Sequence, residues 1–199
     1  MIKNILVAAA VAVVGVGVGA QANELANGGF ETNNLGSEYC YGCTAADWNS
    51  PLLIVSNSGA WGNPSATAGS FQLGTVVAGI QNQQVLTGDF TFVVGHTYQI
   101  TWDDAGRSGY YDHTYDVSAG GVSLGSFSTT SGQAWSEHTE TFQATSTAVL
   151  TFAGQWNVDG TTFIDNVSAI TTAVPEPTSL MLMAFGTLGL LAWRRRAQV

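Results

Sequence analysis

The stretch Thr97-Tyr98-Gln99-Ile100-Thr101-Trp102 decides the fold class, because polar and apolar residues alternate along it. Successive side chains of a β-strand point to opposite faces, so this alternation predicts a strand with its apolar residues in the core. The same period recurs near the end of the domain, where Phe163, Asp165 and Val167 alternate with Ile164, Asn166 and Ser168. No long stretch of the middle of the chain keeps the 3.6-residue apolar period of a helix.

Turn signals separate these short runs. They are Thr87-Gly88-Asp89, Val94-Gly95-His96, Ala119-Gly120-Gly121, Ser131-Gly132 and Asp159-Gly160. Short strands at a spacing of roughly 8–12 residues predict an all-β antiparallel sandwich. We expect eight or more strands and hence a jelly roll, with an immunoglobulin-like sandwich as the alternative. The chain has 199 residues, which fits one such domain over residues 23–173.

Charge is scarce and unevenly placed. Charged residues make up 10% of the chain, and its formal net charge is −9. Within residues 23–173, Arg107 is the single Arg or Lys against thirteen acids, so this part carries −12. A nucleic-acid-binding protein needs a basic patch, and an anionic membrane surface would repel this domain. Divalent cations are therefore the natural counter-charge.

The N-terminus has the pattern of a secretory signal peptide. Lys3 is followed by an apolar run over residues 5–18 and by the small-residue site Ala20-Gln21-Ala22. This order predicts a signal helix over residues 1–22 that is removed after export. The apolar run is shorter than the ~20 residues of a membrane-spanning helix. The alternative is an uncleaved N-terminal anchor.

The C-terminus has three parts in order: Val174-Pro175-Glu176-Pro177, an apolar stretch over residues 178–193, and Arg194-Arg195-Arg196. The prolines end any preceding element. The apolar stretch predicts a short transmembrane helix, and the arginines hold its end in the cytoplasm. The domain would then lie outside the membrane. A buried C-terminal core helix is the alternative, against which the arginines argue.

These three parts resemble the PEP-CTERM sorting signal of Gram-negative bacteria. The resemblance implies a sorting region over residues 174–199, whose sorting motif comprises Pro175, Glu176, Pro177, Arg194, Arg195 and Arg196. It also implies a partner, a membrane-bound exosortase that cleaves near Pro-Glu-Pro. Family members typically reach the cell surface or the extracellular matrix of bacteria that make exopolysaccharide.

A second resemblance lies at the two edges of the domain. Leu25-Ala26-Asn27-Gly28-Gly29-Phe30-Glu31 and Thr162-Phe163-Ile164-Asp165-Asn166-Val167 look like the opening and closing strands of galactose-binding-like carbohydrate-binding modules. The resemblance implies a jelly roll with a structural calcium ion. The implied ligands are Asn27, Glu31 and Asp165, and calcium prefers such oxygen donors. The alternative is that both carboxylates cap turns.

Cys40-Tyr41-Gly42-Cys43 contains the only two cysteines. A zinc site would need further ligands, and no βαβ pattern supports a thioredoxin-like role. In an exported chain the pair predicts a disulfide that closes a short loop. Free thiols with a redox function are the alternative.

The densest polar cluster surrounds Arg107. Glycoside hydrolysis needs two carboxyl groups across a sugar, and Asp103 or Asp104 would have to pair with Asp116 or Glu137. Asp112, His113 and Asp116 are an equally weak metal candidate. We favour a solvated loop in which Arg107 bridges neighbouring aspartates, and we predict no enzyme activity.

Aromatic residues give the strongest indication of a ligand. Sugar rings present apolar faces that pack on aromatic rings, while polar neighbours bind the hydroxyls. Loop-like segments contain the four candidates Trp48, Trp61, Tyr110 and Tyr111, whose alternative role is packing in the core. The leading hypothesis is an exported surface or matrix protein that binds exopolysaccharide. A structural or adhesive matrix protein comes second, and a secreted polysaccharide hydrolase third.

Overall fold

The computed structural model describes residues 23–32, 35, 37–49, 52–55, 61–62, 75–155 and 159–172. Within these ranges the chain forms strands and no helix, so none of the described elements is a helix that could span a bilayer. The strands are β1 Tyr39–Tyr41, β2 Thr44–Ala45, β3 Trp48–Asn49, β4 Leu52–Val55, β5 Val76–Gln81, β6 Val85–Gly88, β7 Thr97–Gly106, β8 His113–Ala119, β9 Val122–Thr129, β10 Ser136–Gln143, β11 Thr151–Gly154 and β12 Thr161–Thr171. The expected signal helix and transmembrane helix lie outside the described residues.

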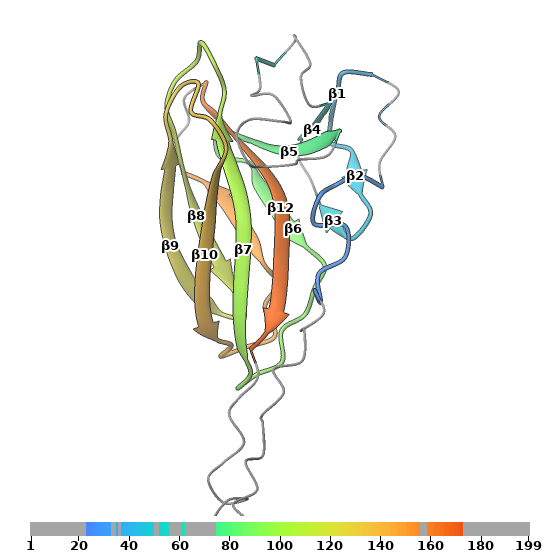
Figure 1. The fold of residues 1–199 in the computed structure, drawn as a ribbon, viewed down its shortest axis with the longest axis vertical. Helices are drawn as coiled ribbons and strands as arrows, with labels where there is room; N and C mark the ends of the chain where they lie inside the picture. Colours follow the sequence, from blue (N-terminus) through green and yellow to red (C-terminus); the bar gives the residue numbers. More distant parts are fainter. Residues whose placement is uncertain are drawn as a thin grey trace, which may run out of the picture.

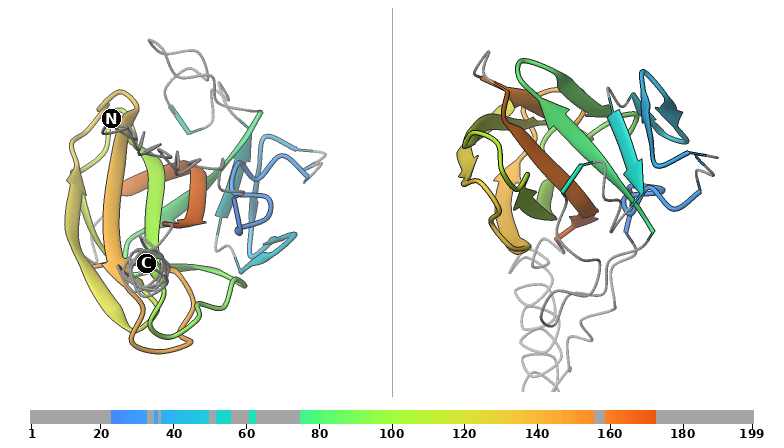
Figure 2. Two further views of the ribbon diagram at one scale, coloured as in Figure 1. Left: turned by 60° about the horizontal axis from the view of Figure 1, so that its bottom comes forward. Right: turned by 90° about the horizontal axis from the view of Figure 1, so that it is seen from above.

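Two six-stranded antiparallel sheets pack face to face (Figures 1 and 2). One sheet has the order β1-β4-β5-β12-β7-β10, and the other has the order β2-β3-β6-β11-β8-β9. From β5 to β8 each connection crosses from one sheet to the other. The predicted all-β jelly-roll sandwich is confirmed.

The main core lies between the sheets. Tyr98, Ile100 and Trp102 of β7 are fully buried there, as their alternation predicts. Tyr115 and Phe152 face them from β8 and β11 of the opposite sheet. Burial of such large rings supplies much of the hydrophobic stabilisation of a sandwich.

A second apolar cluster covers the outer face of the β4-β5-β12-β7 sheet. Leu53 of β4 joins the main core, whereas its neighbours Leu52 and Ile54 point to the other face. There they pack with Trp61 and with Phe163 of β12. The cluster explains why β4 is apolar at every position, and it brings Trp61 to one end of the sandwich.

The end of the domain departs from simple alternation. Phe163 belongs to the outer cluster, but Val167 points into the main core together with Ile164. The pairing of β12 with β7 shifts register between Asp165 and Ser168, and Asn166 adopts a positive φ of 49°. This bulge adds one residue to the strand, so the prediction that Phe163, Asp165 and Val167 share a face is wrong for Val167.

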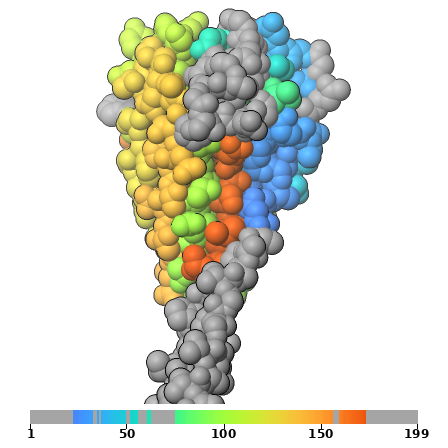
Figure 3. Space-filling model, viewed as in Figure 1, coloured from blue at the N-terminus to red at the C-terminus, as the bar shows by residue number. Residues whose placement is uncertain are grey.

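Strand β12 runs the length of the sandwich, as its arrow in Figure 1 shows. Eleven strand residues span about 35 Å at ~3.3 Å per residue. In Figure 3 the surfaces of β10, β7 and β12 lie side by side, with the N-terminal residues of the domain next to β12. Glu24 donates its backbone N–H to the Ala169 carbonyl there. Thr171 and Glu24 thus lie at the end of the sandwich opposite to Thr161.

Candidate functional site

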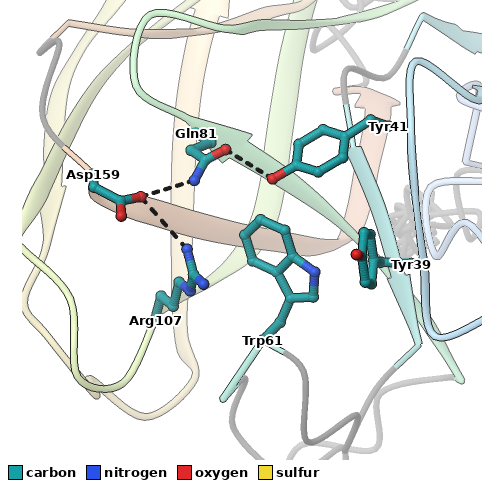
Figure 4. A pocket seen from close by; sticks show the side chains of 6 residues that line it. All are labelled: Tyr39, Tyr41, Trp61, Gln81, Arg107 and Asp159. Atoms are coloured by element: carbon teal, nitrogen blue, oxygen red, sulfur yellow. Dashed lines mark hydrogen bonds and ion pairs between the residues drawn. The ribbon is translucent and has the colours of Figure 1, made fainter.

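A pocket opens at the Thr161 end of the sandwich (Figure 4). Its volume is about 280 Å³, near the lower limit of ~300 Å³ for small-molecule sites. Five separate segments contribute to it: β1, the turn at Trp61, the end of β5, the chain just after β7 and the chain just before β12. The lining residues are Tyr39, Tyr41, Trp61, Gln81, Arg107 and Asp159.

Three aromatic rings form one side of the pocket. Tyr39 and Tyr41 each lie 5.7 Å from the Trp61 ring in edge-to-face geometry, and 5.9 Å from each other. Trp61 is buried, but Tyr39 is 43% exposed and Tyr41 is 50% exposed. The two tyrosines therefore present open ring surface to a ligand, and Trp61 supports them.

A chain of polar contacts forms the other side (Figure 4). The Tyr41 hydroxyl donates to Gln81 Oε1 at 3.0 Å, and Gln81 Nε2 donates to Asp159 Oδ1 at 2.9 Å. Partial burial raises the pKa of the Tyr41 phenol, and the Arg107 charge opposes this effect. The phenol is thus protonated at neutral pH and acts as the donor in this chain.

Arg107 ends the polar chain and is 7% exposed. Its guanidinium lies 4.1 Å from the Trp61 ring centre and 3.3 Å from that of Tyr110, so two rings hold it in place. Arg107 Nη1 is 3.6 Å from Asp159 Oδ1, and its Nε has no hydrogen-bond partner among the described residues. The expectation that Arg107 bridges neighbouring aspartates is wrong, because its ion-pair partner lies far along the chain.

The predicted disulfide between Cys40 and Cys43 is present. It closes a loop that contains Tyr41 and Gly42, and Gly42 adopts a positive φ of 65° that favours glycine. The disulfide thereby restrains the segment that presents Tyr41 to the pocket.

The four aromatic residues singled out in the sequence lie in different environments. Trp61 lines the pocket, whereas Tyr110 stacks on Arg107 without being a lining residue. Tyr111 is 68% exposed and does not line the pocket. Trp48 is buried against Phe30 and donates its indole N–H to the Asn27 carbonyl at 3.1 Å. A ring so placed packs in the core, so the expectation of ligand contact does not fit Trp48.

Four of the lining residues were not predicted from the sequence: Tyr39, Tyr41, Gln81 and Asp159. They are separated along the chain and meet only through the pairing of β1, β4, β5 and β12. The position of Tyr41 inside the cysteine loop was the one available signal.

The candidate calcium ligands lie elsewhere, at the β12 bulge. We call Glu31, Asp103, Asp165 and Asn166 the Asp165 site. Asp165 is fully buried; its Oδ1 accepts the Asn166 N–H at 2.8 Å, but its Oδ2 has no partner among the described residues. Burial raises the pKa of Asp165 to about 8; the Asn166 N–H lowers it, and the Glu31 and Asp103 charges raise it further.

Glu31 is close to Asp165 but already bonded. A Cβ on Gly29 would lie 3.7 Å from Asp165 Oδ1 and 3.8 Å from Glu31 Cγ, which places both side chains around this glycine. Glu31 accepts from the Val76 N–H at 2.9 Å and from the Thr75 hydroxyl at 2.8 Å. Two neighbouring carboxylates, one of which has a buried oxygen without a partner, fit a cation that prefers oxygen ligands.

Asn27 does not fit that role. Its Oδ1 accepts the Thr32 N–H, and its Nδ2 donates to the Ala46 carbonyl. Its own carbonyl accepts from Phe30 and Trp48. Nowhere in the described ranges do three His, Cys, Asp or Glu side chains gather as metal ligands. A cation here would need backbone, amide or water oxygens besides the two carboxylates.

A further buried carboxylate, Asp104, lies between the sheets. Tyr115 donates to Asp104 Oδ2 at 2.7 Å, Gln133 donates to its Oδ1 at 3.2 Å, and Trp102 donates to the Tyr115 oxygen at 2.9 Å. His138 Nε2 lies 3.0 Å from Asp104 Oδ2, at ion-pair distance without hydrogen-bond alignment. We call these five residues the Asp104 network.

The other acidic candidates do not form a common site. Asp103 and Asp104 point to opposite faces of β7, and Asp116 is bonded to Ser126 and Gln155. His113 is buried between Thr162 and the Asn82 carbonyl, and burial lowers its pKa. The pocket itself contains a single carboxylate, Asp159, whereas hydrolysis of a glycoside normally uses two.

Comparison with known proteins identifies the C-terminal segment. Residues 173–196 match the PEP-CTERM protein-sorting motif, which confirms the resemblance drawn from the sequence. The motif indicates an exported protein whose membrane-anchored precursor is processed by an exosortase. No curated protein matches the chain.

Solved structures similar to the domain are mostly carbohydrate-binding modules. TmCBM61, solved in complex with β-1,4-galactotriose, has a TM-score of 0.42 at 15% identity, covering 76% of this chain and 99% of that one. A CBM4 structure has a TM-score of 0.37 at 14% identity, covering 64% and 96%. The K3 cleaved adhesin domain of Lys-gingipain from Porphyromonas gingivalis has a TM-score of 0.43 at 13% identity, covering 62% and 89%.

Proposed function

We propose that the exported domain is a non-catalytic module that binds carbohydrate of the cell surface or matrix through the pocket of Tyr39, Tyr41 and Arg107. The observation that carries this proposal is the pairing of open aromatic rings with a fixed row of polar groups. Aromatic faces take the apolar side of a sugar ring, and the polar groups orient its hydroxyls. The pocket volume suits a single sugar unit of a longer chain.

The polar side chains of the pocket are held in place before a ligand binds. The aromatic rings fix Arg107 before binding, so little side-chain freedom remains to be lost. Its Nη1 lies 3.6 Å from Asp159 Oδ1, which is longer than a hydrogen bond, so this nitrogen can still donate to a ligand. Hydroxyl oxygens of a sugar are suitable acceptors.

The position of the pocket agrees with a surface role. It lies at the Thr161 end of β12, whereas the chain continues from the Thr171 end towards the sorting motif. In the membrane-anchored precursor, about the length of β12 would separate the pocket from the end of the domain that is joined to the sorting motif.

Affinity electrophoresis of the full chain, in mild detergent, tests the proposal against gels containing neutral polysaccharides. We expect retardation by at least one polymer, and a loss of affinity of about tenfold or more in Tyr41→Ala. Tyr111→Ala is the matched control, because this tyrosine is more exposed yet lies outside the pocket lining. No retardation by any polymer, or equal loss in both variants, would overturn the proposal.

We also propose that residues 1–22 direct export and that Pro175-Glu176-Pro177 is the substrate of the exosortase. Replacement of these three residues by alanine should leave the full-length precursor in the membrane fraction, as followed by immunoblot in the native host. Thr172→Ala, just before the motif, should be processed normally. Normal processing of the triple variant would contradict this assignment.

Finally, we propose a structural calcium ion at the Asp165 site, bound by Glu31 and Asp165 and without the Asn27 side chain. The unpartnered buried oxygen of Asp165 supports this proposal. Thermal melts of the wild-type chain and of Asp165→Asn, each with and without calcium, test it.

A further inference from the structure

The charges of the pocket are limited to one pair. Arg107 is the only Arg or Lys of residues 23–173, and Asp159 is the only acidic side chain in the lining. The carboxylate lies 3.6 Å from the guanidinium, and its side chain is 55% exposed. The single positive charge of the domain is therefore countered at the pocket itself.

A ligand can reach the Arg107 guanidinium from few directions. Trp61 and Tyr110 cover its guanidinium, and its Nε atom is inaccessible. Its Nη1 atom lies 3.6 Å from the Asp159 carboxylate. An anionic group that sought the paired N–H donors of Arg107 would have to approach the Asp159 carboxylate at the same time.

Asp159 is held in this position by a second contact. Gln81 Nε2 donates to Asp159 Oδ1 at 2.9 Å, and the Gln81 Oε1 atom accepts from Tyr41. Both polar ends of Gln81 are thus occupied, which fixes the carboxylate beside Arg107. Beyond the pocket, the other twelve acids of the domain add a negative field that falls off over ~10 Å at 0.1 M salt.

We propose that Asp159 is a specificity-determining residue that makes the pocket selective for uncharged sugars and excludes those that carry a carboxylate, such as uronic acids. This inference rests on the proposed carbohydrate binding. Asp159 acts against the wrong ligand by charge repulsion, while Arg107 remains a donor to the hydroxyls of the correct one. The ligand of the pocket is then a neutral unit of a polysaccharide.

The test uses glucan, galactan and mannan, each paired with the same polymer oxidised at C6 to the uronate. Retardation of the full chain in gels of each polymer gives the affinity. We expect the wild-type chain to bind a neutral polymer about tenfold more tightly than its oxidised partner at low salt. Asp159→Asn should abolish or reverse this preference, since Arg107 then lacks its counter-charge.

The amide of Asp159→Asn keeps an oxygen that accepts from Gln81, so the pocket should stay folded; a thermal melt checks this. Asp89→Asn is the matched control, because it removes the same charge at an exposed position outside the pocket. If Asp89→Asn changes the preference as much, the net charge rather than Asp159 sets it, and the inference fails.

Two other results have distinct meanings. If the wild-type chain binds an oxidised polymer as tightly as its neutral partner, the specificity proposal is wrong and carbohydrate binding still stands. If the chain binds no polymer of either kind, both the proposed function and this inference are wrong.

Discussion

The Asp104 network and the Asp165 site contain two equally buried carboxylates on neighbouring strands of one sheet, but their surroundings differ. Asp104 accepts hydrogen bonds from Tyr115 and Gln133 and lies beside His138. Asp165 accepts one N–H, from Asn166, and has the charges of Glu31 and Asp103 nearby. One carboxylate is surrounded by donors and the other by like charge.

The two carboxylates therefore affect the stability of the fold in different ways. The Tyr115 hydroxyl of one sheet donates to the Asp104 carboxylate of the other, so Asp104 links the two sheets through a buried hydrogen bond. Burial and the Asp104 charge raise the pKa of Tyr115, which keeps its phenol a donor. At the Asp165 site, burial and the nearby charges of Glu31 and Asp103 disfavour the ionised carboxylate, so a bound proton or cation would stabilise the site.

The largest predicted effect breaks the Asp104 network. Asp104→Ala leaves the Tyr115 hydroxyl, the Gln133 amide and His138 near an apolar gap, so the free energy of unfolding should fall by about 3–5 kcal/mol. Urea denaturation followed by tryptophan fluorescence measures it.

Asp103→Ala is the matched control, because it changes the adjacent aspartate on the opposite face of β7. Asp103 has one described side-chain donor, Asn166, and burial raises its pKa above the ordinary value. We expect a change of less than about 1 kcal/mol. Equal losses in the two variants would contradict the distinction between the two faces.

The sequence predicted the strand that positions these aspartates but not their partners. Alternation over residues 97–102, continued by two positions, places Asp104 on the face of Trp102. Tyr115, His138 and Gln133 come from three later segments, and no local pattern marks long-range pairing of this kind. The bulge at Asn166 also escaped prediction, because a positive φ at Asn depends on tertiary contacts such as the Val167 N–H to the Gly28 carbonyl.

The pocket was predicted in part for a similar reason. Trp61 and Tyr110 stood out as aromatic residues in loop-like segments, and both flank Arg107. Tyr39 and Tyr41 belong to a short edge strand whose pairing with β4 carries them to the pocket. Asp159 reaches Arg107 only because β12 pairs with β7. The composition of the domain thus identified Arg107 as its single Arg or Lys, but only the strand pairing shows that Asp159 is its ion-pair partner.

A smaller effect should appear in the pH dependence of stability. The folded-state pKa of Asp165, about 8, lies above its ordinary value of 3.8, so its ionisation opposes folding. In EDTA, its stabilising contribution should be full below pH 4 and be lost as the pH rises towards 8. At ~1.4 kcal/mol per pKa unit the full shift corresponds to about 6 kcal/mol, and rearrangement around the ionised carboxylate relieves part of it. We therefore expect a loss on the order of 2–4 kcal/mol relative to Asp165→Asn, which has no such titration.

Urea melts of both chains at several pH values between 4 and 8.5 measure this difference. Asp116→Asn is a suitable control, because hydrogen bonds from Ser126 and Gln155 lower the pKa of Asp116 instead. A wild-type chain whose stability runs parallel to that of Asp165→Asn over this range would show that Asp165 keeps an ordinary pKa.

The smallest expected effect is the stabilisation of the fold by a calcium ion bound at the Asp165 site. Calcium at about 100 times its Kd should stabilise the wild-type chain by about 2–3 kcal/mol at pH 7.5, or several degrees in Tm. It should also flatten the pH dependence, because the cation replaces the proton on Asp165. Asp165→Asn should lose the response, and Glu31→Gln should weaken it. Asn27→Ala, in contrast, should lower Tm equally with and without calcium, since Asn27 is bonded to backbone groups. A calcium response that persists in Asp165→Asn would place the ion elsewhere and leave the buried carboxylate dependent on a proton alone.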